Sequence, residues 1–421
     1  MNILIIGGGI GGLTLALKLH ASGMECSIRI CEAVAGAKPL GVGINMLPHA
    51  MRELCGLGLE PALRAVGVEA KEFAYFTHHG QFILSEPCGK SAGYDFPHFS
   101  IHRADLHKVL FDAAVERLGA GVISMGHRCK GFEQDANGVT AHFADASGKP
   151  LPSQKADIAI ACDGLHSAVR KQLYPAEGAP VFHGINMWRG VTRAKPFLTG
   201  ASITRIGGLF MTGKLLFYPV RNNIDADGNQ LINWVVELYS DKYEPADWTR
   251  PGDINEVLSQ FENWRFDWLD APAILRNAEF TLKYPMVDRD PIAQWTFGRV
   301  TLLGDAAHPM YPRGGNGGAQ SILDAEALTR HLLASADPLQ ALQAYAAERI
   351  PVTREIVLQN RTAPPDLIID TVEKKSKGQR FEKLEDVISE DELHAISKNY
   401  QRVAGWDKET VSTKGRWPNQ P

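Results

Sequence analysis

Several features that would restrict the function of this 421-residue chain are missing from it. No run of 18 or more apolar residues occurs, so we expect no membrane-spanning helix. The net charge of −4 gives no electrostatic reason to expect a nucleic acid or an anionic membrane as a partner. The apolar N-terminus lacks the basic residues of a secretion signal and is interrupted by glycine, so we expect a cytoplasmic protein.

Cysteine is scarce and scattered, and the chain has no internal repeat or low-complexity block. No C-x-x-C pair occurs among the six cysteines, which are Cys26, Cys31, Cys55, Cys88, Cys129 and Cys162. This pattern predicts buried or incidental thiols in a reducing compartment rather than a disulfide framework. We expect no bound metal.

The chain does contain a glycine-rich turn near its start. Gly7-x-Gly9-x-x-Gly12 follows the apolar residues 3–6 and precedes a predicted helix from residue 13. Without Cβ atoms, the backbone of such a turn can approach a pyrophosphate, and the N–H groups of the new helix attract that anion. A predicted strand over residues 26–31 ends at Glu32, where a carboxylate can accept hydrogen bonds from ribose hydroxyls. These elements together predict a dinucleotide site.

A second motif, Gly304 to Pro309, lies far downstream after the apolar residues 300–303. Asp305 is expected at the end of a central strand, where open α/β sheets bind ligands, and its carboxylate can accept a hydrogen bond from a ribitol hydroxyl. The glycine-rich residues 312–318 precede a predicted helix. The positive end of that helix could hold the N1–C2=O edge of an isoalloxazine ring. The two motifs together point to FAD.

Segments rich in aromatic residues alternate with the segments that carry these motifs. Their pattern is typical of a sheet with one face lining a cavity. We expect an α/β fold whose FAD-binding parts cover residues 1–70, 100–180 and 286–360, whose β-rich substrate domain covers residues 71–99 and 181–285, and whose C-terminal helical tail covers residues 361–421. Helices are expected at residues 50–54, 100–118, 319–333 and 338–359, and residues 413–421 are expected to fray.

Asp163-Gly164, with Arg170, adds a third motif, and the three motifs together resemble those of the single-component FAD-dependent aromatic hydroxylases, such as 4-hydroxybenzoate and salicylate hydroxylases. The resemblance also includes Arg103 and covers residues 1–360. Residues 39–45, 100–103, 187–192 and 284–291 are most similar to members that modify phenazines. The resemblance implies a Rossmann-like FAD-binding domain of the glutathione reductase type, with an interleaved β-rich substrate domain.

The resemblance also implies an activity. Such enzymes use NADH or NADPH and O₂ to hydroxylate an aromatic or N-heteroaromatic small molecule through a flavin C4a-hydroperoxide. A phenazine carboxylate, hydroxylated with decarboxylation, is one candidate substrate. The cofactor supplies the difficult chemistry, so the protein's part is to position the ring and exclude water. We expect a monomer or a homodimer.

The expected site residues fall into three groups. Pro309 and Pro312 are expected to form a wall beside flavin C4a. The substrate is expected to meet aromatic side chains, namely Phe210, Phe217, Trp234, Tyr284 and Tyr311. FAD is expected to contact Gly7, Gly9, Gly11, Gly12, Glu32, Gly43, Arg103, Cys129, Asp163, Asp305, Gly315, Asn316 and Gly317.

Structural alternatives stay open for several of these residues. Arg103 could be a solvated arginine at a helix start, Asp163 could belong to an ion-paired turn with Arg170, and Cys129 could be an ordinary buried thiol. His308 could be a general base, although a hydrogen-bonding brace is the commoner role at such a turn. An aromatic side chain on a strand usually packs in the core.

Two other functions fit the same motifs. A flavin halogenase or reductase could use this scaffold, but halogenases carry a W-x-W-x-I-P signature. Trp264 and Trp268 have a different spacing and no Ile-Pro follows them. A flavin-bearing protein that only sequesters a ligand could also keep the FAD motifs.

Overall fold

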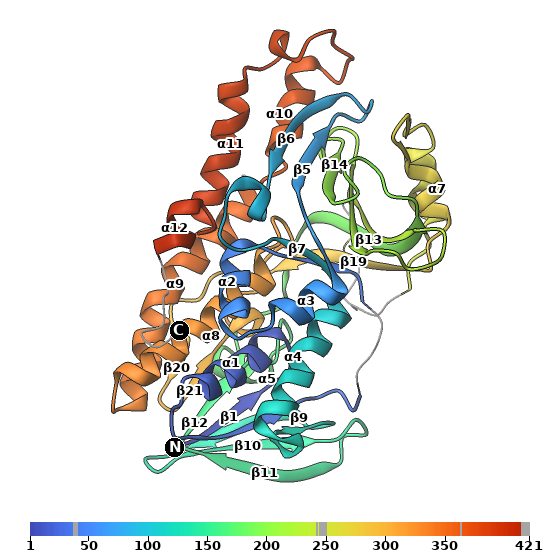
Figure 1. Ribbon diagram of the computed structural model, residues 1–421. Coiled ribbons are helices and arrows are strands. Elements are labelled where there is room, and N and C mark those ends of the chain that lie inside the picture. Colours follow the sequence, from blue (N-terminus) through green and yellow to red (C-terminus); the bar gives the residue numbers. More distant parts are fainter. Residues whose placement is uncertain (37–40, 241–242, 244–250, 363, 414–421) are drawn as a thin grey trace.

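The computed structural model describes residues 1–36, 41–240, 243, 251–362 and 364–413. The resemblance at residues 39–40 and the fraying expected at residues 414–421 lie outside the described residues. Figure 1 shows two main parts, with a parallel sheet and its helices near the N-terminus and a larger antiparallel sheet beyond them. Among the described residues, no helix has both the length and the apolar character needed to cross a membrane.

The first sheet has the strand order β20-β21-β12-β1-β2-β8, and only β20 runs antiparallel to its neighbour. Continuous apolar runs are typical of parallel strands that are buried on both faces, and Ile3 to Ile6 are at most 2% exposed. The strands are β1 (Asn2–Ile6), β2 (Ser27–Cys31), β8 (Ile123–Ser124), β12 (Ile158–Ala161), β20 (Thr296–Phe297) and β21 (Val300–Leu302).

Helices from three distant stretches of sequence pack together around this sheet. The helix after the glycine turn, α1, contacts both α4 and α8, and α8 contacts α9. The predicted helices near residues 50, 319 and 338 are confirmed. The helices of this part are α1 (Ile10–Ala21), α2 (Pro48–Gly56), α3 (Glu60–Val66), α4 (Arg103–Leu118), α5 (Ala168–Leu173), α8 (Asn316–Ala334) and α9 (Pro338–Thr362).

The start of the helix predicted at Ser100 was wrong by three residues. Phe99–His102 forms strand β7, which pairs with β3 and β4, and the helix begins only at Arg103. The pairing of Ser100 and Ile101 with two neighbouring strands overrides the helical pattern. Two small sheets complete this part: β3 (Gly43–Met46), β7 and β4 (Gly67–Glu69), and β9 (Arg128–Gln134), β10 (Val139–Ala144) and β11 (Pro150–Ala156).

The second large sheet has seven strands in the order β19-β13-β16-β15-β14-β5-β6, and only β14 and β5 pair in parallel. Its strands are β5 (Glu72–Phe76), β6 (Phe82–Pro87), β13 (Val181–Ala194), β14 (Ser202–Ile206), β15 (Lys214–Arg221), β16 (Gln230–Tyr239) and β19 (Phe280–Asp288). Its outer face is apolar and packs with α6 (Asn255–Leu258), α7 (Ala271–Arg276) and the pair β17 (Arg265–Phe266) and β18 (Leu269–Asp270). Its inner face includes Met187, Arg189, Leu216, Tyr218, Asn233, Val235 and Tyr284, which share one side of the sheet by register.

The C-terminal stretch forms α10 (Leu367–Ser376), α11 (Glu390–Val403) and α12 (Lys408–Thr413). Figure 1 shows α10 and α11 beside β5 and β6. Residues from all three helices share a core cluster with Phe73, Tyr75 and Ile83 of those two strands. Short 3₁₀ turns occur at Gly89–Ala92, Ala120–Val122, Ser259–Phe261, Gly304–Ala306 and Leu384–Asp386.

Candidate active site

The glycine turn between β1 and α1 leaves room for a ligand at one glycine and is closely packed at two others. A Cβ at Gly7 would lie 2.4 Å from the Cys162 carbonyl oxygen, and one at Gly12 would lie 2.1 Å from the Gly7 oxygen. At Gly9, the N-cap of α1, no atom lies within 4 Å of the position of a Cβ. The first turn of α1 has no acidic residue and no side-chain cap, so its N–H groups face an open space that suits an anion.

Glu32 lies at the end of β2 beside this turn. Its Oε2 accepts a hydrogen bond from the Gly8 N–H at 2.7 Å, and its Oε1 accepts one from the Val34 N–H at 2.8 Å. His107 of α4 contacts the Gly8 carbonyl oxygen at 2.8 Å. The carboxylate is therefore fixed next to the proposed pyrophosphate position, where further lone pairs can accept from hydroxyls.

The second motif lies close to the N-terminus of α8. Asp305 is exposed on its 3₁₀ turn, and a Cβ at Gly317 would lie 3.8 Å from its Oδ1. Gly315 has a φ of +70°, and its Cβ would lie 3.4 Å from Cβ of Asn45 in β3. The structure therefore brings together three segments that the sequence separates: the 3₁₀ turn, the start of α8, and β3.

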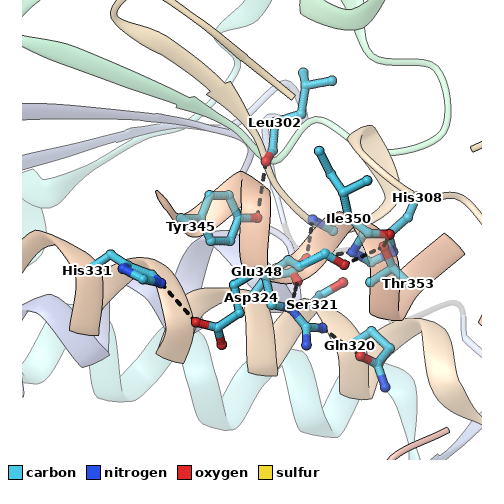
Figure 2. A network of polar contacts seen from close by, with 12 residues as sticks. Leu302, His308, Gln320, Ser321, Asp324, His331, Tyr345, Glu348, Ile350 and Thr353 are labelled. Carbon is cyan, nitrogen blue, oxygen red and sulfur yellow. Dashed lines mark hydrogen bonds and ion pairs between the residues drawn. The ribbon is translucent and has the colours of Figure 1, made fainter. Parts of the chain in front are cut away.

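A buried polar network centred on α8 contacts and stabilises the second motif (Figure 2). Asp324 of α8 is fully buried. Its Oδ2 lies 2.5 Å from His308 Nε2 and accepts from the Gly304 N–H at 3.0 Å, and its Oδ1 accepts from Arg349 Nε at 2.7 Å. Burial alone would raise the pKa of Asp324, but His308 and Arg349 lower it to about 2. This geometry favours the bracing role of His308.

Arg170 also supports the second motif. Its Nη1 donates to the carbonyl oxygens of Ala306 at 3.1 Å and Ala307 at 2.7 Å, and its guanidinium pairs with Glu177. Asp163 accepts from the Ala168 N–H through Oδ2, while its buried Oδ1 has no partner among the described residues. Burial raises the pKa of Asp163. The two residues therefore do not form the ion-paired turn that was the structural alternative.

The remaining expected cofactor residues have mixed environments. Arg103 is exposed at the start of α4. Cys129 is buried in β9, and burial raises the pKa of its thiol to about 12, which keeps the thiol neutral. Pro309 is buried and Pro312 is exposed, on either side of Tyr311.

The structure contradicts two of the five expected substrate residues. Phe217 and Trp234 are fully buried on the outer face, in the apolar core that includes residues of α6 and α7, because their strand register turns them away from β3. Phe210 is 68% exposed in the loop between β14 and β15. Tyr284 and Tyr311 do share a buried cluster at the inner face, with Val42 beside β3.

The inner face meets β3 at Gly43. A Cβ there would come within 2.8 Å of Tyr218, Asn233 and Val220, and the Gly43 N–H donates to Asn233 Oδ1 at 2.6 Å. Arg189 Nη2 donates to the Gly43 carbonyl oxygen at 2.8 Å, and its Nη1 donates to Tyr284 Oη at 3.0 Å. The sequence reasoning missed Arg189, Tyr218 and Asn233. The alternation that put Trp234 on one face of the sheet also puts Asn233 on the other.

Buried polar atoms without hydrogen-bond partners gather around this junction. Among the described residues, the atoms without such partners include Arg189 Nε, Asn233 Nδ2, Tyr311 Oη, Arg313 Nε and Nη2, and Asn316 Oδ1. Most of them are donors. Buried donors in native proteins are normally satisfied, so this set fits a ligand rich in acceptor atoms, as the polar edge of a flavin or an anionic substrate would be.

Comparison with known proteins agrees with this chemistry. A family model described as an FAD binding domain matches residues 1–203 and 271–360. The chain is 42% identical, over 364 residues, to the phenazine 1,6-dicarboxylic acid hydroxylase PhzS of Lysobacter antibioticus, covering 86% of this chain and 89% of the relative. It is 30% identical to the 3-hydroxybenzoate 6-hydroxylase of Klebsiella oxytoca, covering 86% and 87%.

Solved structures share the fold. Klebsiella pneumoniae HpxO, complexed with FAD and uric acid, matches with a TM-score of 0.72 at 23% identity, over 98% of this chain and 97% of that one. CtdE, in complex with FAD and a substrate, matches with a TM-score of 0.73 at 19% identity, over 96% and 98%.

Proposed function

We propose that the substrate of this chain is a phenazine carboxylate. The premise is that the chain belongs to the family defined by this FAD binding domain and is an FAD-dependent aromatic-ring monooxygenase. One observation carries the proposal: the 42% identity to a hydroxylase of phenazine 1,6-dicarboxylic acid extends over most of both chains. The donor-rich junction at the inner face supports an anionic aromatic ligand. We propose NADH or NADPH as the electron donor.

In this proposal, the described residues hold the cofactor between the two parts of the fold. The N-terminus of α1 at Gly9 receives the pyrophosphate, Glu32 and Asp305 accept from ribose and ribitol hydroxyls, and the start of α8 faces the polar edge of the ring. Bound FAD supplies the activation of O₂ and the transfer of one oxygen atom to the substrate. The inner face positions the aromatic ring and excludes water.

For a decarboxylative reaction, the hydroxyl group replaces the carboxyl group. The balance is then ArCOOH + O₂ + NAD(P)H + H⁺ → ArOH + CO₂ + H₂O + NAD(P)⁺. The C–C bond to the carboxyl group breaks and a C–O bond forms at the same carbon. If hydroxylation occurs at another ring position, the carboxyl group is retained and no CO₂ is released.

The test uses the FAD-loaded enzyme with phenazine-1-carboxylate, ¹⁸O₂ and either NADH or NADPH. We expect the substrate to accelerate nucleotide oxidation and the product to carry one ¹⁸O atom, with CO₂ release reporting decarboxylation. 3-Hydroxybenzoate serves as the comparison substrate. Acceleration by 3-hydroxybenzoate and not by the phenazine would overturn the substrate assignment, and label derived only from water would overturn oxygenation.

A further inference from the structure

Arg189 is a partly buried cation of the inner face, and the charge of Glu237 acts on it only from beyond ion-pair distance. Its hydrogen-bond partners are all neutral: the Gly43 carbonyl oxygen at 2.8 Å and the Tyr284 hydroxyl at 3.0 Å, with the Tyr218 hydroxyl also within hydrogen-bond reach. Among the described residues, no carboxylate forms an ion pair with its guanidinium. Its Nε is closed to solvent and has no acceptor.

The neighbouring phenol of Tyr218 cannot supply the missing charge. Burial raises the pKa of Tyr218 to about 12, against the opposing effect of Arg189, so this phenol is neutral at working pH. Glu237 lies on the same face but pairs with Lys214 at 2.7 Å. Lys214 is in turn 2.6 Å from Asp366, and Arg313 Nη2 lies 3.9 Å from Glu237 Oε2, so two cations other than Arg189 are within ion-pair distance of these two buried carboxylates.

Arg189 is only partly exposed, and a cation that has lost much of its hydration without an ion pair normally faces an anion or a ligand. The planar guanidinium, with its unpartnered Nε, matches the fork of a carboxylate. Two neutral partners fix the guanidinium against β3, which orients it without satisfying its charge. The position next to Gly43 and Tyr284 is where the proposed function places the aromatic substrate.

We propose that Arg189 binds the carboxylate of the aromatic substrate and selects acids over their neutral analogues. The inference rests on the proposed function insofar as it assumes a substrate that carries a carboxylate. It assigns the specificity for that group to one residue of β13, with Tyr218 and Tyr284 as the residues that orient it.

The test compares phenazine-1-carboxylate with the neutral phenazine-1-carboxamide. Dissociation constants are measured by flavin-fluorescence quenching on the FAD-loaded wild-type enzyme and on Arg189→Met, Arg189→Lys and Arg193→Met. Arg193 lies on the same strand, is 57% exposed and pairs with Glu279, so it is the matched control. FAD content and thermal midpoint are recorded for each variant.

We expect the wild type and Arg193→Met to bind the acid at least tenfold more tightly than the amide. Arg189→Met should bind the two alike, through weaker binding of the acid, and Arg189→Lys should recover part of the preference. The midpoint potential of the bound flavin should stay the same. These results together support a carboxylate site at Arg189.

Other outcomes overturn the inference in distinguishable ways. An acid preference that survives in Arg189→Met overturns it and leaves the proposed function standing. If Arg189→Met shifts the midpoint potential of the bound flavin and leaves the ratio of the acid and amide dissociation constants unchanged, the Arg189 cation stabilises the reduced flavin instead of binding the carboxylate. If the wild type binds neither phenazine-1-carboxylate nor 3-hydroxybenzoate, the proposed function fails and the inference fails with it.

Discussion

At the scale of single residues, Asp305 is the acid that the sequence links most directly to the cofactor. It is exposed on its turn and close to Gly317 at the start of α8. We predict that Asp305→Ala loses a charge-assisted hydrogen bond to the ribitol chain, which is worth about 1.5–3 kcal/mol and corresponds to a roughly 10- to 100-fold weaker binding of FAD. Titration of the apoprotein with FAD measures the change.

The control for this experiment is Asp112→Ala on α4, because Asp112 is exposed and, among the described residues, pairs with Lys108 alone, one turn away. That variant should bind FAD like the wild type. Full retention of flavin by Asp305→Ala would remove Asp305 from the site.

The raised pKa of a second residue, Asp370, predicts how the free energy of unfolding depends on pH. Burial and the neighbouring Asp366 raise the pKa of Asp370 from 3.8 to about 6. The folded state therefore holds this proton more tightly than the unfolded state, and its contribution to stability falls as the pH rises from about 4 to about 6. Asp370→Asn should flatten this slope and raise the free energy of unfolding at pH 7 by about 1 kcal/mol, a value reduced for partial exposure.

Thermal unfolding of the wild type and Asp370→Asn at pH 4.5 and pH 7.5 checks this sign. Asp391→Asn, on the exposed side of α11, controls for the loss of one negative charge. If Asp370→Asn is less stable than the wild type at pH 7.5, the prediction is wrong. The hydrogen bond from the Phe210 N–H to Asp370 Oδ1, at 3.5 Å, would then require the charged carboxylate.

At the scale of elements, the glycines of the turn between β1 and α1 have two different environments. Gly7 and Gly12 are closely packed, whereas Gly9 faces an open space that is proposed to receive a ligand. A Cβ at Gly12 would lie 2.1 Å from the Gly7 carbonyl oxygen, whereas at Gly9 nothing lies within 4 Å and φ is −77°. We predict that Gly12→Ala loses about 1–3 kcal/mol of stability by overpacking. Gly9→Ala should fold with an unchanged midpoint yet bind FAD more weakly, because its methyl group occupies the open space.

The thermal midpoint of the apoprotein and the dissociation constant of FAD separate the two effects. If Gly9→Ala binds FAD as tightly as the wild type, the pyrophosphate does not lie against α1 at this position. Equal losses of stability in both variants would show instead that the turn is constrained along its whole length.

The sequence predicted these elements well where the signal is local. The glycine spacing, the apolar run before it and the acid after β2 all depend on neighbours in sequence, so the first βαβ unit could be foreseen. Parts of three strands of the second large sheet, β13, β15 and β16, were also foreseen from their alternation and aromatic content. The face of the sheet that is proposed to meet the cofactor could not be foreseen, because it depends on the contact between Gly43 and Asn233, which lie 190 residues apart.

The same limit explains the errors in the substrate residues. Trp234 and Phe217 have the expected aromatic character but point to the outer face, while the less conspicuous Arg189 and Tyr218 point to the inner one. An arginine between the apolar residues of β13 was a usable signal, because an arginine in apolar surroundings normally has a partner. At Ser100, a strand pairing that is not local to the sequence displaced the predicted start of a helix.

At the scale of the whole molecule, the candidate site depends on the C-terminal stretch, which lies beyond the residues matched by the family model. Tyr400 of α11 is buried, accepts from Asn316 Nδ2 at 2.8 Å and donates to Asn360 Oδ1 at 2.7 Å. Its hydroxyl also lies 3.3 Å from the Arg313 carbonyl oxygen. A helix far away in sequence therefore holds the loop that precedes α8, which is the loop proposed to face the flavin ring.

This coupling predicts a functional effect for a change outside the FAD-binding part. Tyr400→Phe leaves two buried amide atoms without a partner, which costs about 1–3 kcal/mol. The loop at Arg313–Asn316 should then be less firmly placed, and a larger fraction of the NAD(P)H consumed should yield H₂O₂ instead of hydroxylated product, because water reaches the site more readily. Peroxide and product are quantified against nucleotide oxidation, with Tyr239→Phe, a change at a 59% exposed residue, as the control. A lower thermal midpoint with an unchanged peroxide fraction would mean that α11 stabilises the fold without positioning the loop, and the site would then depend only on the segments that the family model covers.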